Sequence, residues 1–483
     1  MKKYPKAKSS RRRGITTTQV AIAIAVIAVI AAVAFAVTYT PPSPAPVTIT
    51  QTSVQTSVQT SLQTSVQTSV QTSVVTSVQT STVKPTPTPV TLTIWHTYAP
   101  GSGELEAFNA SVAAFQATYP YIILNIQLKP FGAAQADFVT ASLAGKAPDV
   151  LRIAHDWTGS FVAQGFVAPL EPYIDVAFLD RYLPVAVQDY QFRGRTWGLA
   201  ENINHLALIY NKDLVPTPPA TTDELIKIAQ GITQKDATGK ITQAGIVWNL
   251  ADLYWFSGFL NGFGGSIFDP ARPGYPAVNS SAAVDAIQFI SDLIAKYEVT
   301  PPGADYGVMM NLFNTGKAGM IINGPWSLSD IKKAGINYGV AALPTVSKTG
   351  KPIAPLIGSQ GWVIASGKSP EVTDAAFKFI AWVTSEASQK LFIEKAGTLP
   401  SNRDLVTDPI ITGNPDAAGY LAQAFKGAPF PNIPEMAAVW APMGAALSET
   451  IPTDITKPPT PAAIQAALNK AEADILRAIG TLG

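Results

Sequence analysis

The stretch TLTIWHTYAPGSGELEAFNASVAAFQATYPYIILNIQL, residues 91–128, sets the fold class of this chain. It begins with TLTIWHTY, rich in β-branched and aromatic side chains, which predicts a strand ending near Tyr98. After the loop APGSG, apolar residues recur three and four positions apart, which predicts a helix with one buried face. The residues of that face are Leu105, Phe108, Val112 and Phe115. YIILNIQL then predicts a second strand, so the stretch forms a strand–helix–strand unit.

The unit is continued by a further predicted helix and by APDVLRIA, residues 147–154, as a third strand. Strands that alternate with helices indicate an α/β fold around a mainly parallel sheet. Ligands of such open sheets bind outside the carboxyl ends of the strands. His96, Tyr98 and the cluster 154–157 follow predicted strands directly, so we expect them at that rim.

Composition limits the classes of function. The chain has 483 residues, enough for two or three domains, and no cysteine, which excludes disulfides, thiolate metal sites and a lipid-modified cysteine. The first thirteen residues hold seven of its 34 Lys and Arg, which leaves 27 basic against 33 acidic residues, a net charge of −6. A mildly acidic body without a basic stripe makes nucleic acid an unexpected partner.

The N-terminus predicts a basic leader (1–14) followed by a transmembrane or pilin-like helix (15–38). Val20–Val37 is an uncharged apolar run, long enough to cross a bilayer core of roughly 30 Å. RRRGITTTQ before it resembles the pilin-like signal of archaeal surface proteins, which is cut after the glycine, here Gly14. A plain membrane anchor and a cleaved secretory signal are the alternatives. All three place the rest of the chain outside the cytoplasm.

Residues 39–89 predict a stalk. Eight tetrads built on Q-T-S-V occupy residues 51–82 between proline-rich flanks, with no residue large enough to form a core. Such a segment is typical of an extended, O-glycosylated spacer that would span up to roughly 150 Å.

Enzyme signatures are missing. Only three histidines occur, and there is no HExxH, GxSxG or P-loop motif. We therefore predict no catalytic residue, no metal site and no cofactor, and His155 is better explained as a structural histidine. A glycosidase carboxylate pair has no sequence signature, so a surface carbohydrate-active enzyme stays open as an alternative.

The tryptophans indicate a ligand class. Of nine, Trp157, Trp326 and Trp440 stand in turn-like sequences rather than in apolar runs, and Tyr254 lies in DLYWF. Flat aromatic faces among carboxylates and amides suit sugars, because a pyranose has an apolar face to stack and hydroxyls that need hydrogen-bond partners.

Five segments carry a family resemblance. They are AHDWTGSFVAQG (154–165), ALIYNKDLVPTPPATTDEL (207–225), GMIINGPWSLSDI (319–331), INYGVAALPT (336–345) and PNIPEMAAVW (431–440). In this order they resemble the maltose-binding protein family, the extracytoplasmic solute-binding components of ABC sugar importers. The resemblance covers roughly residues 90–483.

The resemblance implies an α/β, periplasmic-binding-protein-like fold of type II with two discontinuous lobes joined by hinges. We expect the N-terminal lobe to comprise 90–203 and 358–400, and the C-terminal lobe 204–357 and 401–483. The chain would then cross between lobes near 203–206, 354–358 and 400–402.

The resemblance also implies the site. Asp156 matches a family aspartate that binds sugar hydroxyls, and three aromatic residues match its stacking platforms. Asn204 stands where the family has a glutamate, with Glu201 as the alternative carboxylate, and APGSGE replaces a charged pair after the first strand. Trp157 replaces a basic residue, and Trp362 is a further candidate at the rim. The predicted sugar-binding residues are Tyr98, Asp156, Trp157, Glu201, Tyr254, Trp326, Trp362 and Trp440.

The function implied is capture of a maltose-, trehalose- or maltodextrin-like sugar between the lobes and its delivery to an ABC permease. Asp156 and Trp157 would act from the N-terminal lobe, and Tyr254, Trp326 and Trp440 from the C-terminal lobe. The receptor would sit at the cell surface, held to the membrane by its N-terminal helix. An adhesive surface protein is the remaining alternative, and the residues do not say which sugar is bound.

Overall fold

The structure is a computed structural model that describes residues 88–480. The predicted leader, the apolar helix and nearly all of the stalk lie outside the described residues. Within residues 88–480, none of the helices combines the length and hydropathy that a bilayer crossing requires.

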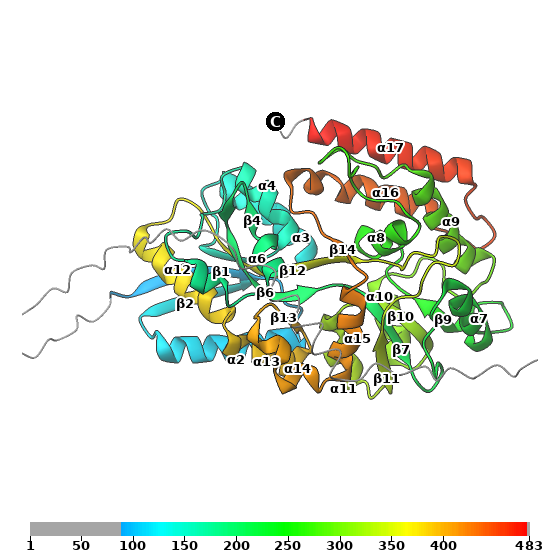
Figure 1. The fold of residues 1–483 in the computed structure, drawn as a ribbon, viewed down its shortest axis with the longest axis horizontal. Helices are drawn as coiled ribbons and strands as arrows, with labels where there is room; N and C mark the ends of the chain where they lie inside the picture. Colours follow the sequence, from blue (N-terminus) through cyan, green and yellow to red (C-terminus); the bar gives the residue numbers. More distant parts are fainter. Residues whose placement is uncertain (1–87, 481–483) are drawn as a thin grey trace, which may run out of the picture. The chain divides into compact units, whose positions relative to one another are not determined.

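The N-terminal lobe is built on one sheet with the strand order β13-β6-β12-β3-β1-β2, and β14 adds to β12 (Figure 1). Its strands are β1 (Val90–His96), β2 (Ile122–Leu128), β3 (Val150–Ala154), β6 (Gly198–Asn204), β12 (Leu356–Ile364), β13 (Leu399–Pro400) and β14 (Ala428–Pro429). β1 is parallel to β2 and β3, whereas β12 is antiparallel to β3 and β6. The opening stretch thus forms β1, helix α2 (Gly103–Thr118) and β2, and the predicted α/β class is confirmed.

Helices cover both faces of this sheet because consecutive strand residues point to opposite sides. Ile94 packs with Phe108 of α2 and Phe379 of α12 (Pro370–Val383) on one face. Trp95 belongs to the other face, with Phe138 of α3 (Phe131–Leu143). The further helices of this lobe are α4 (Thr158–Ala163), α5 (Val176–Leu179), α6 (Pro184–Asp189) and α13 (Glu386–Ala396), and the hairpin β4 (Gln191–Phe192) and β5 (Arg195–Thr196) lies beside them.

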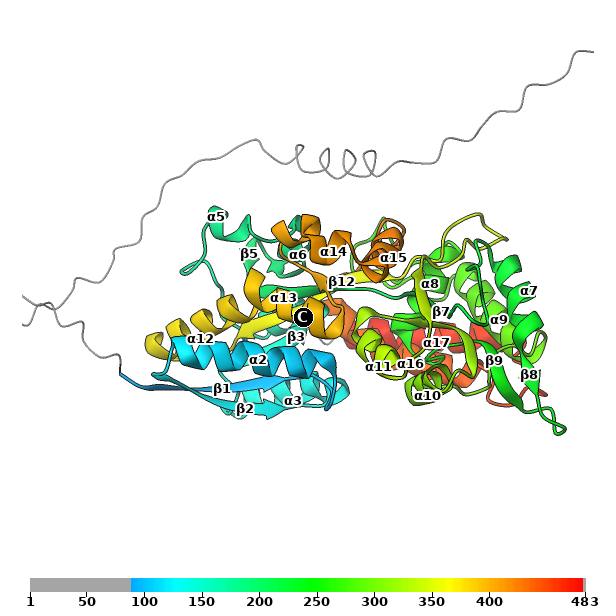
Figure 2. The ribbon, with the colours of Figure 1, turned by 90° about the horizontal axis from the view of Figure 1, so that it is seen from below.

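The C-terminal lobe has a second sheet with the order β11-β7-β10-β9-β8 (Figures 1 and 2). Its strands are β7 (Ala207–Asn211), β8 (Gln234–Lys235), β9 (Ile241–Val247), β10 (Ala318–Asn323) and β11 (Tyr338–Ala341). The helices around it are α7 (Thr222–Ile232), α8 (Leu253–Gly262), α9 (Ser281–Ala295), α10 (Tyr306–Asn314), α11 (Leu328–Lys333), α15 (Pro415–Ala424), α16 (Trp440–Thr450) and α17 (Pro461–Ile479).

The chain passes between the two sheets at identifiable points. Asn204 still pairs with β12 of the first sheet, whereas Ala207 pairs with β10 of the second. Leu356 begins the return strand β12. The third passage falls later than the predicted 400–402, because the Ser401 hydroxyl donates to the carbonyl of Ala200 at 2.7 Å. After η3 (Asp404–Thr407) and α14 (Pro409–Thr412), α15 packs on β11 in the C-terminal lobe.

Residues 428–438, which we call the strap, return to the N-terminal lobe. β14 pairs with β12, and η4 (Pro434–Ala438) contacts α4 and the turn that follows β3. The Asn432 amide donates to the carbonyls of Gln188 and Asp189 at the end of α6, at 3.3 and 3.0 Å, and to that of Gln191 in β4 at 2.9 Å. Gly159 leaves room for this contact, since a Cβ there would lie 2.2 Å from the carbonyl oxygen of Asn432.

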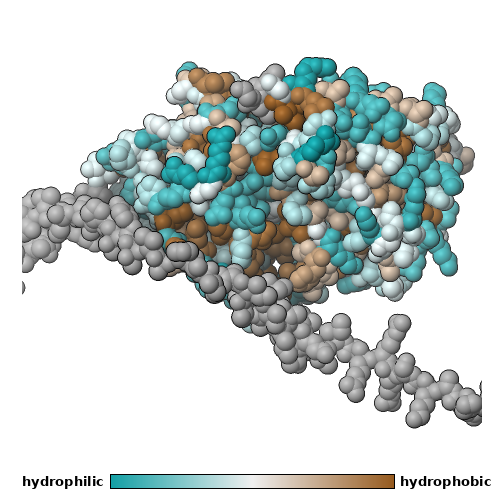
Figure 3. Space-filling view, turned by 45° about the horizontal axis from the view of Figure 1, so that its top comes forward, coloured by the Kyte–Doolittle hydropathy of each residue, from teal (hydrophilic) through white to brown (hydrophobic). Residues whose placement is uncertain are grey.

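Apolar side chains at the surface are scattered. Figure 3 shows hydrophobic residues in separate patches on a largely hydrophilic face. The most exposed large ones are Leu143, Val176 and Phe425. Isolated residues of this kind are ordinary on soluble domains.

Candidate functional site

The site begins at the carboxyl end of β3. There the chain turns into the short 3-10 helix η1 (His155–Trp157), which places Asp156 and Trp157 at the edge where ligands of α/β sheets bind. Both side chains are nearly buried, at 2% and 5% exposure. A carboxylate this enclosed needs hydrogen-bond donors, and the sequence around it supplies few.

A donor comes from the other lobe. The Trp440 indole Nε1 donates to Asp156 Oδ2 at 3.1 Å. Burial raises the pKa of Asp156 to about 6, an effect that His155 and the Trp440 hydrogen bond oppose. The site therefore joins two lobes through a carboxylate that is mostly ionised at neutral pH and gains a proton near pH 6.

Aromatic rings form one wall of the site. Tyr254 opens α8, Trp326 lies in η2 (Pro325–Ser327), Phe430 lies in the strap, and Trp440 opens α16. Ring centroids are 6.5 Å apart for Tyr254–Trp326 and 6.0 Å for both Tyr254–Phe430 and Phe430–Trp440. All four are half-buried, so each leaves part of its surface free. Burial raises the pKa of Tyr254, and the charge of Asp156 adds to the rise, which places the phenol near the carboxylate.

Tyr98, Glu201 and Trp362 lie elsewhere. All three are fully buried in the N-terminal lobe, so the rim position expected for Tyr98 and Trp362 is wrong. The Trp362 ring stacks on Phe108 at 5.6 Å, and its Nε1 donates to Glu201 Oε2 at 2.8 Å. The Tyr98 hydroxyl donates to the same oxygen.

Glu201 is the centre of this buried cluster. Its Oε1 accepts from Nε and Nη2 of Arg152 at 3.2 and 3.0 Å, and from the Asn202 amide at 3.3 Å. Together with Tyr98 and Trp362, these donors occupy both carboxylate oxygens. Glu201 therefore holds Arg152 inside the lobe and has no free oxygen for a sugar.

Two further polar groups lie closer to the junction of the lobes. They are Glu104, which the sequence did not single out as a binding residue, and Asn204, which stands where the family has a glutamate. Glu104, in the first turn of α2, is 3.5 Å from Arg152, and its side chain is 12% exposed. Burial raises the pKa of Glu104. The charge of Arg152 opposes this rise, and the charge of Glu201 adds to it. Asn204, at the end of β6, donates to Asn202 Oδ1 at 2.9 Å, but its own Oδ1 is buried without a partner among the described residues. That oxygen is therefore an unsatisfied hydrogen-bond acceptor.

Tyr306 is a further aromatic residue that the sequence did not reveal. It opens α10, is 37% exposed, and its ring lies 6.1 Å from that of Trp255. Burial raises the pKa of Tyr306, and hydrogen bonds to Asn323 and Trp326 oppose the rise. The charge of Asp330 adds to it, followed by that of Glu104 of the other lobe. The segment DYGVMM resembles an ordinary helix start, so only the fold brings Tyr306 to Trp326.

No group of three or more His, Asp or Glu side chains in residues 88–480 is placed to hold a metal ion. The site instead consists of aromatic faces, the enclosed carboxylates of Asp156 and Glu104, and the amide oxygen of Asn204. Two α/β lobes joined by several crossings, with such a site at their junction, are the arrangement of proteins that bind a small solute between two lobes.

Comparison with known proteins names the family. The sequence pattern described as "Bacterial extracellular solute-binding protein" matches residues 99–390, and the chain belongs to this family. A maltotriose-binding protein of Pyrococcus abyssi (strain GE5 / Orsay) is 30% identical over 388 residues, which cover 80% of this chain and 82% of that protein. A maltodextrin-binding protein of Bacillus subtilis (strain 168) is 31% identical over 305 residues, which cover 62% of this chain and 71% of that protein.

Solved structures agree with this assignment. The maltose/maltodextrin-binding domain of Bdellovibrio bacteriovorus, bound to maltotriose, superposes with a TM-score of 0.75 at 29% identity and covers 81% of this chain and all of its own. The Thermus thermophilus maltotriose-binding protein gives a TM-score of 0.72 at 30% identity, with 80% and 100% covered. The predicted family and the type II two-lobe fold are confirmed.

Proposed function

We propose that this protein captures an α-glucan oligosaccharide of the maltose–maltodextrin class between its lobes and delivers it to the permease of an ABC importer. The observation that carries the proposal is the Trp440–Asp156 hydrogen bond, which sets an aromatic wall against a buried carboxylate across the two lobes. The names of the relatives, for maltotriose and maltodextrin, supply the sugar class.

Each group has a role in this proposal. Tyr254, Trp326 and Trp440 stack the apolar faces of successive glucose rings, and Asp156 accepts hydrogen bonds from their hydroxyls. A sugar hydroxyl donates to Asn204 Oδ1, which has no donor among residues 88–480 of the free protein. Tyr98, Glu201 and Trp362 support the N-terminal lobe and do not touch the sugar.

Capture works by a shift between open and closed lobe arrangements. Sugar favours the closed form because only there do both lobes contact it, and Asp156 and Trp326 come from opposite lobes. The protein would act outside the cytoplasm, tethered by the apolar segment Val20–Val37, and would catalyse no reaction on its cargo.

Calorimetric titration of the full-length protein tests the proposal. The panel is maltose, maltotriose, maltotetraose, trehalose and a galacto-oligosaccharide, in a detergent without a sugar headgroup. We expect one-to-one binding of the α-glucans, weakened by Trp440→Ala and by Asp156→Asn but not by Trp362→Phe. Absence of heat across the panel, or steady release of reducing ends, would refute a binding function for this class of sugar.

A further inference from the structure

We propose that Phe131 and Trp157 form an additional stacking subsite on the N-terminal lobe, which takes an outer glucose ring of a longer α-glucan. The inference rests on the proposed function and extends it, because it predicts that the site distinguishes α-glucans by their chain length. Neither residue belongs to the aromatic wall formed by Tyr254, Trp326, Phe430 and Trp440.

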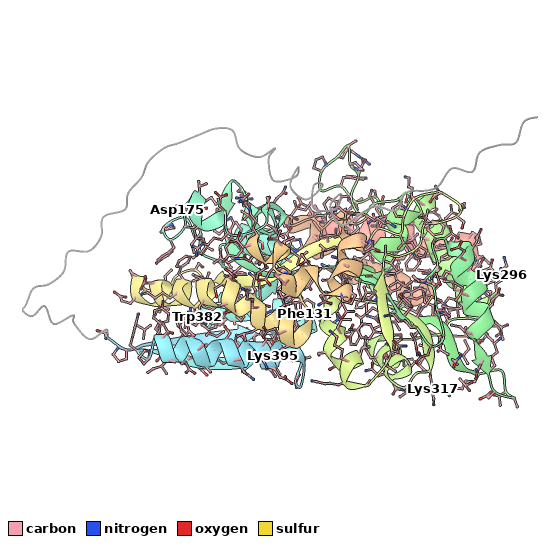
Figure 4. All side chains as sticks on the ribbon, turned by 60° about the horizontal axis from the view of Figure 1, so that its bottom comes forward. Phe131, Asp175, Lys296, Lys317, Trp382 and Lys395 are labelled. Atoms are coloured by element: carbon pink, nitrogen blue, oxygen red, sulfur yellow. The ribbon has the colours of Figure 1, made fainter. Side chains whose placement is uncertain are left out.

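The fold brings the two residues to the ligand-binding edge. β1 is parallel to both β2 and β3, so the carboxyl ends of the three strands share one edge of the sheet. Phe131 begins α3 only three residues after β2 ends at Leu128, and Trp157 lies in the turn after β3. Figures 1 and 2 both place α3 at the side of the N-terminal lobe nearest the other lobe, and Figure 4 labels Phe131 there.

The rings of Phe131 and Trp157 are in contact. Their centroids are 5.4 Å apart and their planes are inclined by 36°. Trp157 is 5% exposed and is backed by the fully buried Phe161 at 6.1 Å, whereas Phe131 is 46% exposed. Trp157 thus holds a ring whose outer surface remains free.

Exposure alone would not single out Phe131, since Leu143 at the other end of α3 is 75% exposed. Phe131 differs because its ring contacts Trp157, which follows Asp156 directly in the same 3-10 helix. Asp156 in turn accepts from Trp440 of the aromatic wall. In this proposal, a glycan that fills the wall and bonds to Asp156 extends to the Phe131 ring on the N-terminal lobe.

Titration with linear α-glucans from maltose to maltoheptaose tests this subsite on the full-length protein. For the wild type we expect one increment in chain length to improve Kd by roughly tenfold, the scale of one added aromatic contact. Phe131→Ala should lose this increment and leave Kd for the shorter sugars unchanged. Phe131→Tyr keeps the ring and should keep the increment, and Leu143→Ala should match the wild type at every length.

The outcomes separate this inference from the proposed function. If the wild type binds α-glucans but Phe131→Ala changes Kd equally at all lengths, or at none, the subsite is refuted while the proposed function stands. If the wild type binds no α-glucan, the proposed function itself fails. Thermal melting of each variant checks folding, and an unchanged Tm is expected for a residue exposed to this extent.

Discussion

Replacing Glu201 by Gln should destabilise the protein and leave sugar binding intact. The carboxylate is fully buried and accepts from Tyr98, Arg152, Asn202 and Trp362. Glutamine keeps the shape but removes the charge, and it turns one acceptor oxygen into an NH2 group that faces other donors. Arg152 would then remain buried with its closest counterion gone.

The magnitude follows from this geometry. Removal of one partner of a buried ion pair costs about 3–5 kcal/mol of unfolding free energy. The lower end applies, about 3 kcal/mol, because Glu104 remains 3.5 Å from Arg152 as a second counterion. With an unfolding entropy of about 2.1 cal/mol/K per residue over residues 88–480, Tm should fall by about 4 °C.

Differential scanning calorimetry and sugar titration measure the two quantities on the same preparation. Glu394→Gln, at an exposed position of α13, is the matched control and should change neither. A Glu201→Gln variant with unchanged Tm and a Kd raised by an order of magnitude or more would refute the reasoning. Glu201 would then contact sugar, as its position three residues before Asn204 first suggested.

Three further predictions concern the site and the strap. Burial raises the pKa of Asp156 to about 6, so titration at several pH values should show sugar affinity falling as pH is lowered through about 6. The stability of the sugar-free protein should change the opposite way, falling as pH rises from 3.8 to about 6, because the folded state holds this proton more tightly. Asp156→Asn should flatten both pH profiles. A pH dependence that persists in this variant would contradict the assignment of the titration to Asp156. Trp440→Ala should raise Kd by roughly 30-fold, because a central aromatic contact with the sugar is lost. Trp362→Phe should instead lower the free energy of unfolding by about 1–2 kcal/mol without changing Kd. If both variants raise Kd equally, both rings belong to the binding site. Gly159→Ala should cost about 1–3 kcal/mol of unfolding free energy, measured in urea, because its Cβ would collide with the backbone of Asn432; a wild-type midpoint would mean that the strap is not packed against α4.

The sequence was sufficient for the fold class because each local pattern agrees with the global one. In residues 91–128, period-2 and period-3.6 patterns alternate and are joined by short loops, and the structure has β1, α2 and β2 there. The position of Asp156 followed from the rule that ligands bind at the carboxyl ends of strands. Both inferences depend on residues close together in the chain.

Burial was harder to predict, and Glu201 shows why. Every residue of β6 is buried, so no alternation of polar and apolar positions marks which side chains face the core. Its partner Arg152 lies 49 positions away, on β3. A polar residue inside a strand therefore looked like a ligand-binding group, although its donors are all internal.

The contacts of the strap were also hard to predict from the sequence, because they join residues that are far apart in the chain. PNIPEM marks the family, but its sequence does not reveal that Asn432 donates to carbonyls of α6 and β4, more than 240 positions earlier. These three hydrogen bonds fix the strap to the N-terminal lobe. Trp440 follows the strap directly and opens a helix of the C-terminal lobe, where α16 packs on α17. This platform is consequently held from both lobes, whereas Trp326 and Tyr254 belong to elements of the C-terminal lobe alone. These long-range hydrogen bonds therefore decide which parts of the site are held by which lobe. The predicted lobe boundary at residue 401 does not capture this division, because residues 428–438 return to the N-terminal lobe.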